Sequence, residues 1–434
     1  MGLAAAGTVA VAVVVAITLL PALLAFVGKR ILPRRERRAA QEAGTKEGFG
    51  FRWARLVLRL RLPVIVVGVA GLGALAIPAA DMRLALPGAS AGPAGTAARD
   101  AADLIKEGFG PGFNGRLALV VSSGSPQATA AAANDVSKAL RGTPNLLAVT
   151  PPNLSQDKKT AVLGVIPTTG PTDEATETLV HDIRAVASGV ARDVGGASIA
   201  LTGQTAIGVD VSEKLADALP TYLLIVVGLS VLLLALVFRS VLVPVKAALG
   251  FLLTVGATFG ITVLVFQQGH LADLVGLDPP GPLVSFLPIL LVGILFGLAM
   301  DYEVFLVSRM REDFMHGDTP RQATVNGMGH GARVVTAAAL IMTSVFAGFI
   351  LVDDAVIKSM GFALAIGVVI DAFIVRMTIV PAVMSLLGRA AWWLPGWLSK
   401  VLPNVDIEGQ RLREHLLARS ARPAGEPERE LTRV

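Results

Sequence analysis

Residues Pro282 to Val307 read PLVSFLPILLVGILFGLAMDYEVFLV, and this run settles the class of protein. The hydrocarbon core of a bilayer is about 30 Å thick and needs about 20 predominantly apolar residues in a helix. The run is long enough, yet it contains two carboxylates, Asp301 and Glu303. Ionisable side chains are costly inside a bilayer and mark candidate functional positions. We therefore expect a membrane-spanning helix that carries functional charge.

Comparable apolar stretches recur along the chain. The predicted spans are Met1–Gly28, Leu62–Ala80, Leu219–Phe238, Val243–Phe266, Pro282–Val307, Val334–Val352 and Met360–Gly388. Lys246 interrupts the fourth near its start, and the seventh contains Asp371 and Arg376. A membrane β-barrel would instead show alternating segments of about ten residues. The pattern predicts a membrane protein built as an α-helical bundle of about seven transmembrane helices.

The composition excludes other classes of protein. Of the 434 residues, 53% are hydrophobic and only 16% are charged, whereas an average soluble protein has about 25% charged residues. The chain has no cysteine, so disulfides and thiolate ligands are excluded. Phosphate-binding, zinc-protease, nucleophile-elbow and calcium-loop motifs are absent from the sequence. We therefore predict a protein that is not an enzyme, is not driven by ATP, and needs neither a metal nor an organic cofactor.

The positions of Lys and Arg predict the orientation. Between Lys29 and Arg61 there are eleven basic and three acidic residues, which places this loop in the cytoplasm. The tail after Gly388 is also basic, and strict alternation of the spans then places 81–218 outside the cytoplasm. The net charge of +5 is thus an orientation signal. A nucleic-acid partner is not expected, because the basic clusters lack interleaved aromatic residues and any known binding module.

The region from 81 to 218 has the pattern of a water-exposed domain. Its predicted elements are strand Leu117–Val121, helix Gln127–Leu140, strands Leu146–Val149 and Thr160–Ile166, helix Asp173–Val194 and strand Ala197–Leu201. This βαββαβ order is that of the split-βαβ, ferredoxin-like fold, an α+β arrangement. Residues 205–218 form an amphipathic lead-in to the third span. His181 falls on the polar side of its helix, which favours a surface residue over a metal ligand.

Asp301 is the first candidate functional residue. Gly293, Gly297 and Asp301 recur every four residues, so they share one face of the helix. Glycines let a neighbouring helix approach closely, and we expect Asp301 to face protein rather than lipid. Such a carboxyl group either loads and releases a proton or stays protonated as a hydrogen-bond donor between helices. Tyr302 is adjacent and is suited to donate a hydrogen bond to a carboxylate.

The other charges in the spans receive lesser roles. Glu303 lies about 200° around the helix from Asp301 and is predicted to be a snorkelling or packing charge. Asp371 and Arg376 are separated by about 140° on an α-helix, so they are not expected to form a self-contained pair. Asp371 is the second candidate for proton transfer, and Arg376 is interpreted as structural.

These residues lead to a family resemblance. Gly297–Glu312, GLAMDYEVFLVSRMRE, closely resembles the signature in the second transmembrane half of MMPL-type transporters of the resistance–nodulation–division (RND) superfamily. Further resemblance lies in Thr18–Leu24, Glu107–Gly115, Thr336–Met342 and Asp371–Pro381. The resemblance implies proton-motive-force-driven export of lipids or other hydrophobic molecules across the cytoplasmic membrane. Protons are then the coupling ion, and the external domain is a porter domain that accepts cargo near the outer leaflet.

In that family two Asp-Tyr pairs, one from each half, face each other and relay protons; here Asp301 and Tyr302 match one pair. The seven spans resemble the last span of the first half and all six of the second. Expected partners are therefore membrane lipids, the cargo, and the missing first half or further copies of this chain. The alternative is a non-transporting scaffold or accessory subunit, or one half of a split pump.

The expected boundaries follow from the spans and from the resemblance. They are a transmembrane helix at 1–28, a cytoplasmic basic loop at 29–61, a transmembrane helix at 62–80, the extracytoplasmic porter domain at 81–218, five transmembrane helices at 219–388 and a largely disordered cytoplasmic tail at 389–434. Residues 1–28 lack the basic start of a signal peptide. They fit either a reverse signal anchor or an internal helix of a longer protein.

Overall fold

The computed structural model describes residues 2–27, 48–93, 95–194, 196–277, 280–396 and 398. Seven helical segments in this part of the chain are long and apolar enough to cross a membrane, as predicted. They are Ala6–Phe26, Arg61–Asp81, Gln204–Phe238, Leu242–Gln267, Leu287–Met315, Pro320–Leu351 and Ala355–Trp392. The chain divides into two units, Met1–Gly48 and Phe49–Val434. The first unit contributes helix α1 (Gly2–Val27), which has Pro21 within it.

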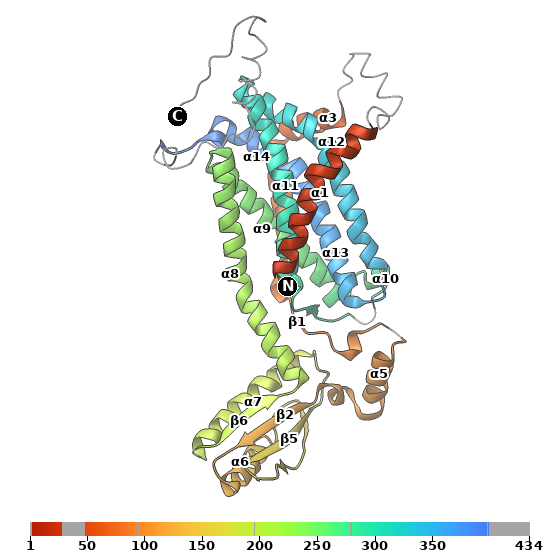
Figure 1. Cartoon of the computed structure of the whole chain (residues 1–434), viewed down its shortest axis with the longest axis vertical. Coiled ribbons are helices and arrows are strands. Elements are labelled where there is room, and N and C mark those ends of the chain that lie inside the picture. Colours follow the sequence, from red (N-terminus) through yellow and green to blue (C-terminus); the bar gives the residue numbers. More distant parts are fainter. Residues whose placement is uncertain are drawn as a thin grey trace, which may run out of the picture. The chain divides into compact units, whose positions relative to one another are not determined.

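The second unit contains the helical bundle (Figure 1). Its long helices are α4 (Arg61–Ala76), α8 (Gln204–Phe238), α9 (Leu242–Thr262), α11 (Leu287–Met315), α12 (Pro320–Gly348) and α13 (Ala355–Val369). Helix α13 continues through the π-helix η7 (Ile370–Ile379) into α14 (Val380–Leu387). Helix α11 contacts α8, α9, α12 and α13, and the spans that begin with α9 and α13 are the most buried of the bundle.

Glycine allows close helix packing between α4 and α9. A Cβ atom at Gly260 of α9 would overlap the carbonyl oxygen of Leu75 in α4. At Gly256, one turn earlier, a Cβ atom would lie 3.2 Å from the Cβ atom of Ala76. Small residues at such positions let two helix backbones approach, which is the usual basis of helix association in membranes.

The segment predicted as a cytoplasmic loop at 29–61 contains a helix, α3 (Phe49–Arg59), which corrects that prediction for its second part. Its buried residues Ala54, Val57 and Leu58 recur at helical spacing, and the helix packs on α12. The Trp53 indole Nε1 donates to the carbonyl oxygen of Met377, 3.0 Å away. The basic residues of this segment drew attention away from that apolar stripe. Residues 28–47 lie outside the described part.

Two spans begin earlier than their hydrophobicity predicted. Helix α8 starts at Gln204, so the amphipathic lead-in and the third span form one continuous helix. Helix α12 starts at Pro320, with the Thr319 hydroxyl accepting a hydrogen bond from the Gln322 amide, 3.3 Å away. A capping threonine followed by proline is a typical helix start. The helix therefore begins at its cap rather than at its first apolar residue.

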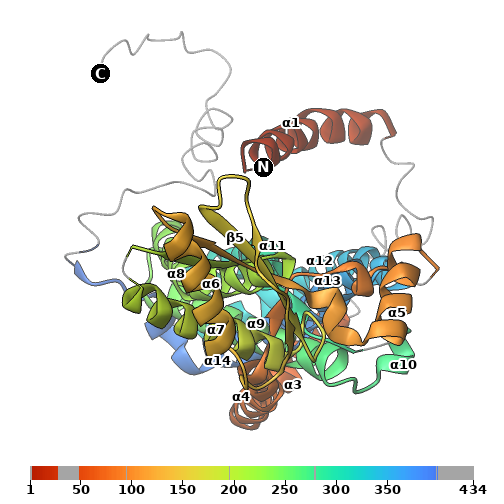
Figure 2. The same ribbon diagram turned by 90° about the horizontal axis from the view of Figure 1, so that it is seen from below.

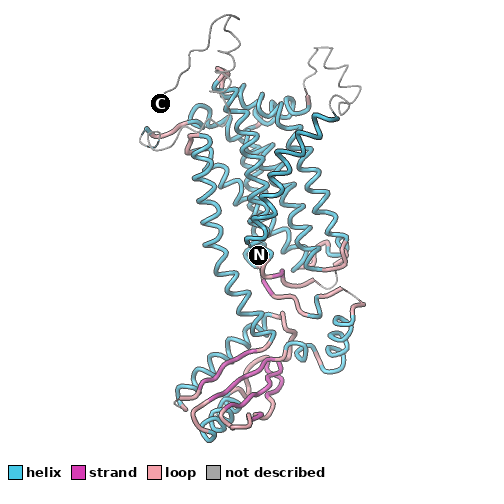
Figure 3. Tube along the Cα trace, viewed as in Figure 1, coloured by secondary structure: helices cyan, strands magenta, loops and turns pink. Residues whose placement is uncertain are grey.

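The domain that the sequence predicts to lie outside the cytoplasm, which we call the external domain for that prediction, is a mixed layer of strands and helices between residues 117 and 202. Its elements are β2 (Leu117–Ser122), α6 (Pro126–Ala139), β3 (Leu146–Val149), β4 (Asn153–Leu154), β5 (Thr160–Pro167), α7 (Glu174–Asp193) and β6 (Ser198–Thr202). The sheet order is β3-β5-β2-β6, with short β4 beside β5, and these pairings are antiparallel. Figure 3 shows the strands gathered at one end of this unit.

Alternating residues of strand β2 form part of the hydrophobic core of this domain. Leu117, Leu119 and Val121 of β2 are buried, while the residues between them are partly exposed. They pack with Leu179 and Ile183 of α7 and with apolar residues of α6. Helices α6 and α7 contact each other, and Figure 2 shows them running beside one another. The external domain thus has its own core, separate from that of the bundle.

The remaining elements are short and precede, link or follow the longer ones. They are η2 (Ile77–Asp81), β1 (Leu84–Ala85), η3 (Ala89–Ala91), α5 (Ala97–Phe109), η4 (Pro111–Gly115), η5 (Val263–Gln267), α10 (Ala272–Val275), β7 (Leu283–Val284), η6 (Phe349–Leu351) and η8 (Gly388–Trp392). Strands β1 and β7 pair in parallel. The Gln267 side chain accepts from the Arg83 amide at 2.8 Å and donates to the Asp81 carbonyl at 2.7 Å. Residues from 399 onward, which hold most of the predicted disordered tail, lie outside the described part.

Candidate functional site

Four ionisable side chains meet inside the bundle, and we call them the charge cluster: Lys246, Glu303, Asp371 and Arg376. Lys246 on α9 donates to Glu303 on α11, with Nζ 2.5 Å from Oε1. Arg376 donates through Nη1 to the other Glu303 oxygen, Oε2. Its Nε lies 3.2 Å from both oxygens of Asp371. The two cations and two carboxylates form one connected network across three segments of the bundle.

The charge cluster is withdrawn from solvent. The exposed fraction of the side chain is 0% for Glu303, 1% for Arg376, 4% for Asp371 and 7% for Lys246. With each group in its ordinary charge state, the charges cancel. Removing one member of a buried ion pair leaves the other uncompensated, which typically costs about 3–5 kcal/mol. Each member therefore depends on the others to remain charged in the bundle.

The π-helix brings Asp371 and Arg376 together, which corrects the prediction that they do not form a pair. A separation of five residues gives about 140° on an α-helix. Both residues lie instead in η7, where backbone bonds run from residue i to i+5. The Thr378 hydroxyl follows the same spacing and donates to the carbonyl oxygen of Phe373, 2.7 Å away. Residues five apart in this segment thus lie near one face, and the Arg376 guanidinium reaches Asp371.

One guanidinium nitrogen in the charge cluster is unsatisfied. Arg376 Nη2 is buried and has no hydrogen-bond partner among the described residues. Buried donors without partners are rare in folded proteins and are found preferentially at functional sites. Asp371 has a further polar contact, because the hydroxyl of Thr254 on α9 lies 3.5 Å from its Oδ1 atom.

Asp301 and Glu303 point in different directions from α11. The 200° separation predicted that the two side chains face different ways, but it is Glu303 that faces the interior of the bundle, as a fully paired charge rather than as a snorkelling one. Asp301 is exposed, and in the described part of the chain it has no ion-pair or hydrogen-bond partner. Within the unit Phe49–Val434, Asp301 therefore does not face protein, contrary to the expectation. No helix described in that unit covers the glycine stripe at Asp301.

The residues near Asp301 on α11 differ in whether they contact another helix or are exposed. Gly293 lies against α8, because a Cβ atom there would be 2.7 Å from the Tyr222 hydroxyl. Gly297 is exposed and has open space where a Cβ atom would lie. Tyr302, next to Asp301, is half-buried. The stripe therefore contacts α8 at Gly293 and is uncovered from Gly297 to Asp301.

Lys246 and Glu303 are the members of the charge cluster to which sequence reasoning gave no functional role. A signal was present in the spans, because two cations and three carboxylates fall in otherwise apolar stretches. Buried charges are almost always paired, so four of these groups pair as two cations with two carboxylates. One carboxylate is left over, and the structure shows that it is Asp301.

The fold and this site define a multi-pass membrane protein whose helical bundle encloses an ion-pair network. The chain belongs to the MMPL family, whose model matches residues 1–66 and 93–409. The match covers most of the chain and includes the first helix, the external domain and every member of the charge cluster.

Several curated proteins are similar to this chain. Membrane protein YdfJ of Bacillus subtilis is 44% identical over 417 residues, which are 96% of this chain and 56% of YdfJ. The mycolic acid-containing lipids exporter MmpL11 of Mycolicibacterium smegmatis is 34% identical over 92% of this chain and 42% of the relative. The trehalose monomycolate exporter MmpL3 of the same organism is 38% identical over 49% of this chain and 21% of the relative. The chain thus spans about half the length of YdfJ and less of the two exporters.

Proposed function

We propose that this chain is the C-terminal half of a proton-driven exporter that moves lipids or other hydrophobic molecules across the cytoplasmic membrane. The observation that carries the proposal is the position of two carboxylates on α11. Glu303 is fully paired in the charge cluster, whereas Asp301, two residues earlier, is exposed and has no partner among the residues that the structure describes. An ionisable group within a membrane span is a functional candidate by default.

In this proposal Asp301 carries the proton, and Tyr302 is its hydrogen-bonding neighbour. Asp371 belongs to the charge cluster, and we assign it a supporting role in which it transmits the change of charge to η7. The exposed face that includes Gly297 and Asp301 receives the first half of the transporter. The length of the relatives supports this assignment, since this chain covers 56% of YdfJ and 42% of MmpL11.

The cargo class is proposed from the relatives. Two of them are named as exporters, one of mycolic acid-containing lipids and one of trehalose monomycolate. By extension, this chain handles lipidic or similarly hydrophobic cargo, with the protons of the membrane gradient as the coupling ion. We propose that residues 81–218 are a ferredoxin-like porter domain outside the cytoplasm, and that the C-terminus lies in the cytoplasm.

A second candidate function is an accessory subunit or one half of a split pump. The unpaired state of Asp301 in the described part of the chain favours it, because a relay needs a second group to exchange protons with. Under this proposal the chain does not transport until a partner supplies the first-half Asp-Tyr pair.

Reconstitution separates a transporter half, whether or not it belongs to a split pump, from an accessory subunit that does not transport. Proteoliposomes would contain this chain alone, or this chain together with the N-terminal half of a full-length relative, and would report movement of a fluorescent lipid under an imposed pH gradient. Gradient-dependent movement only with both halves supports a transporter half. Movement by this chain alone establishes autonomous transport, and a stable complex without any movement supports the accessory function.

A further inference from the structure

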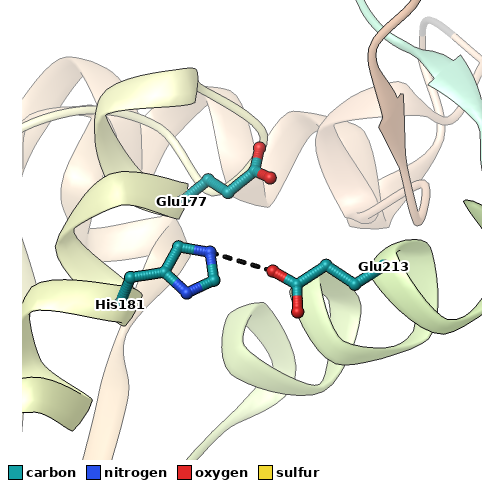
Figure 4. A group of neighbouring side chains, drawn as sticks. All are labelled: Glu177, His181 and Glu213. Carbon is teal, nitrogen blue, oxygen red and sulfur yellow. Dashed lines mark ion pairs between the residues drawn. The ribbon is translucent and has the colours of Figure 1, made fainter. Parts of the chain in front are cut away.

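Three metal-ligating side chains meet where the external domain contacts the helix that continues into the bundle. Glu177 and His181 lie four residues apart on α7, a spacing that places them on one helix face. Glu213 reaches them from α8 (Figure 4). Within the described residues this is the one group of three or more histidine and carboxylate side chains close enough to hold a metal ion. We call it the α7–α8 triad.

The triad is compact enough for a single ion. One ligand atom from each residue lies within 4.8 Å of the other two, and His181 Nε2 is 2.9 Å from Glu213 Oε1. Around a tetrahedral zinc ion with bonds of about 2.0–2.2 Å, neighbouring ligand atoms are about 3.4 Å apart. The required movement is therefore about an ångström. The side chains can make it, because His181 is 50% exposed and Glu213 is 40% exposed.

The charge around the triad also suits a divalent cation. Two carboxylates and a neutral imidazole give a local charge of −2. The neighbouring cation on this interface is already neutralised, since Arg184 Nη2 lies 2.7 Å from Asp210 Oδ1. That pair is three residues further along α7 and three residues earlier on α8, in register with the triad. Arg184 therefore does not compete for the triad carboxylates.

The donor set selects the class of metal. One histidine and two carboxylates form a ligand set that suits zinc and related first-row transition metals, whereas calcium and magnesium prefer six or more oxygen ligands. Three protein ligands leave one position open for water. The exposure of His181 and Glu213 leaves the triad open to solvent, which can supply a water ligand.

We propose that Glu177, His181 and Glu213 bind one divalent transition-metal ion, with Zn²⁺ as the best match, and that the ion fastens α7 to α8. The sequence alone predicts His181 as a surface residue, because it falls on the polar side of its helix, and predicts no metal site. Helix α8 runs without interruption from Gln204 at the external sheet to Phe238 in the bundle. A bound ion would therefore restrain the external domain directly on a membrane helix, independently of what the chain transports.

Isothermal titration of the purified, metal-free full chain with Zn²⁺ tests the proposal. The absence of cysteine removes the strongest competing ligands, and the chain has only five histidines. We expect one site per chain and an increase in the thermal unfolding midpoint at saturating Zn²⁺. Glu177→Gln, His181→Ala and Glu213→Gln should each weaken binding at least tenfold and reduce that increase.

Two matched controls separate metal binding from folding. His270→Ala removes a histidine outside the triad and should leave Zn²⁺ affinity unchanged. Arg184→Gln breaks the neighbouring α7–α8 ion pair without removing a ligand, and binding should persist. Glu177→Gln is the decisive variant, because it leaves the His181–Glu213 pair intact and should match the wild-type unfolding temperature without metal. The proposal is overturned if the wild type does not bind Zn²⁺, or if the three triad variants bind it as tightly as the wild type.

Discussion

Arg376 donates from Nε to both carboxylate oxygens of Asp371, at 3.2 Å each, across a spacing of five residues. An α-helix would place these side chains on different faces, and the π-helical turn of η7 places them on one. Nη1 of the same guanidinium donates a hydrogen bond to Glu303 of α11. The guanidinium therefore links η7 to α11, and a change of charge at either carboxylate alters the electrostatic environment of both segments.

Neutralising Glu303 should destabilise the bundle strongly. Glu303→Gln leaves Lys246 and Arg376 with one carboxylate between them, and we expect a loss of about 3–5 kcal/mol in unfolding free energy. Denaturation of the purified chain in mixed micelles measures it. Lys246→Met should restore the charge balance, so the double variant is expected to be more stable than Glu303→Gln alone. Equal stability of the wild type and Glu303→Gln would contradict the ion-pair network.

The geometry of Arg376 should matter beyond its charge. Arg376→Lys keeps the positive charge but replaces a planar fork that contacts two carboxylates with a single ammonium group. We expect a lower unfolding temperature and loss of transport in the assembled exporter. Arg309→Lys is the matched control, because Arg309 is exposed and pairs only with Glu312 among the described residues. If both substitutions have the same small effect, a positive charge at position 376 is sufficient for stability and transport, and the planar guanidinium is not needed.

The close packing of α4 on α9 should depend on the glycine at position 260. Gly260→Ala places a methyl group where the Leu75 carbonyl oxygen lies, and overpacking of this kind costs about 1–3 kcal/mol or more. The folded yield in detergent and the unfolding temperature should both fall. Gly73→Ala on α4 is the control, because a Cβ atom there meets nothing within 4 Å. A fall of the same size in both variants would show that the close approach at Gly260 is not responsible.

Much of the architecture could be predicted from local patterns. Apolar length alone locates the seven spans, and alternation in Leu117–Ser122 locates a core strand. Helix caps, rather than hydrophobicity, decide where α12 begins. Helix α3 was missed because its apolar stripe is narrow and lies among basic residues.

The site was harder to predict, for two physical reasons. The angle argument for Asp371 and Arg376 assumed α-helical geometry, and η7 does not have it. The argument for Asp301 identified a face suited to close packing, but a stripe of glycines does not show whether a helix of the same unit covers that face, and none described in Phe49–Val434 does at Asp301. Pairing the opposite charges of the spans would have found the charge cluster, since charges excluded from solvent need partners. The triad of Glu177, His181 and Glu213 depends on a tertiary contact that no spacing in the sequence reveals.

Proton-coupled lipid movement by Asp301→Asn is the most direct test of the central claim. Vesicles containing this chain and its complementary half would report a fluorescent lipid and internal pH together, beside Glu312→Gln as a control carboxylate of the same helix. Because Asp301 is exposed and has no partner in the described part of the chain, its neutralisation should leave membrane insertion and unfolding temperature unchanged. We predict that Asp301→Asn abolishes both lipid movement and its accompanying proton flux, while Glu312→Gln retains them. Wild-type lipid movement with undiminished proton flux in Asp301→Asn would contradict the assignment of Asp301 as the proton carrier.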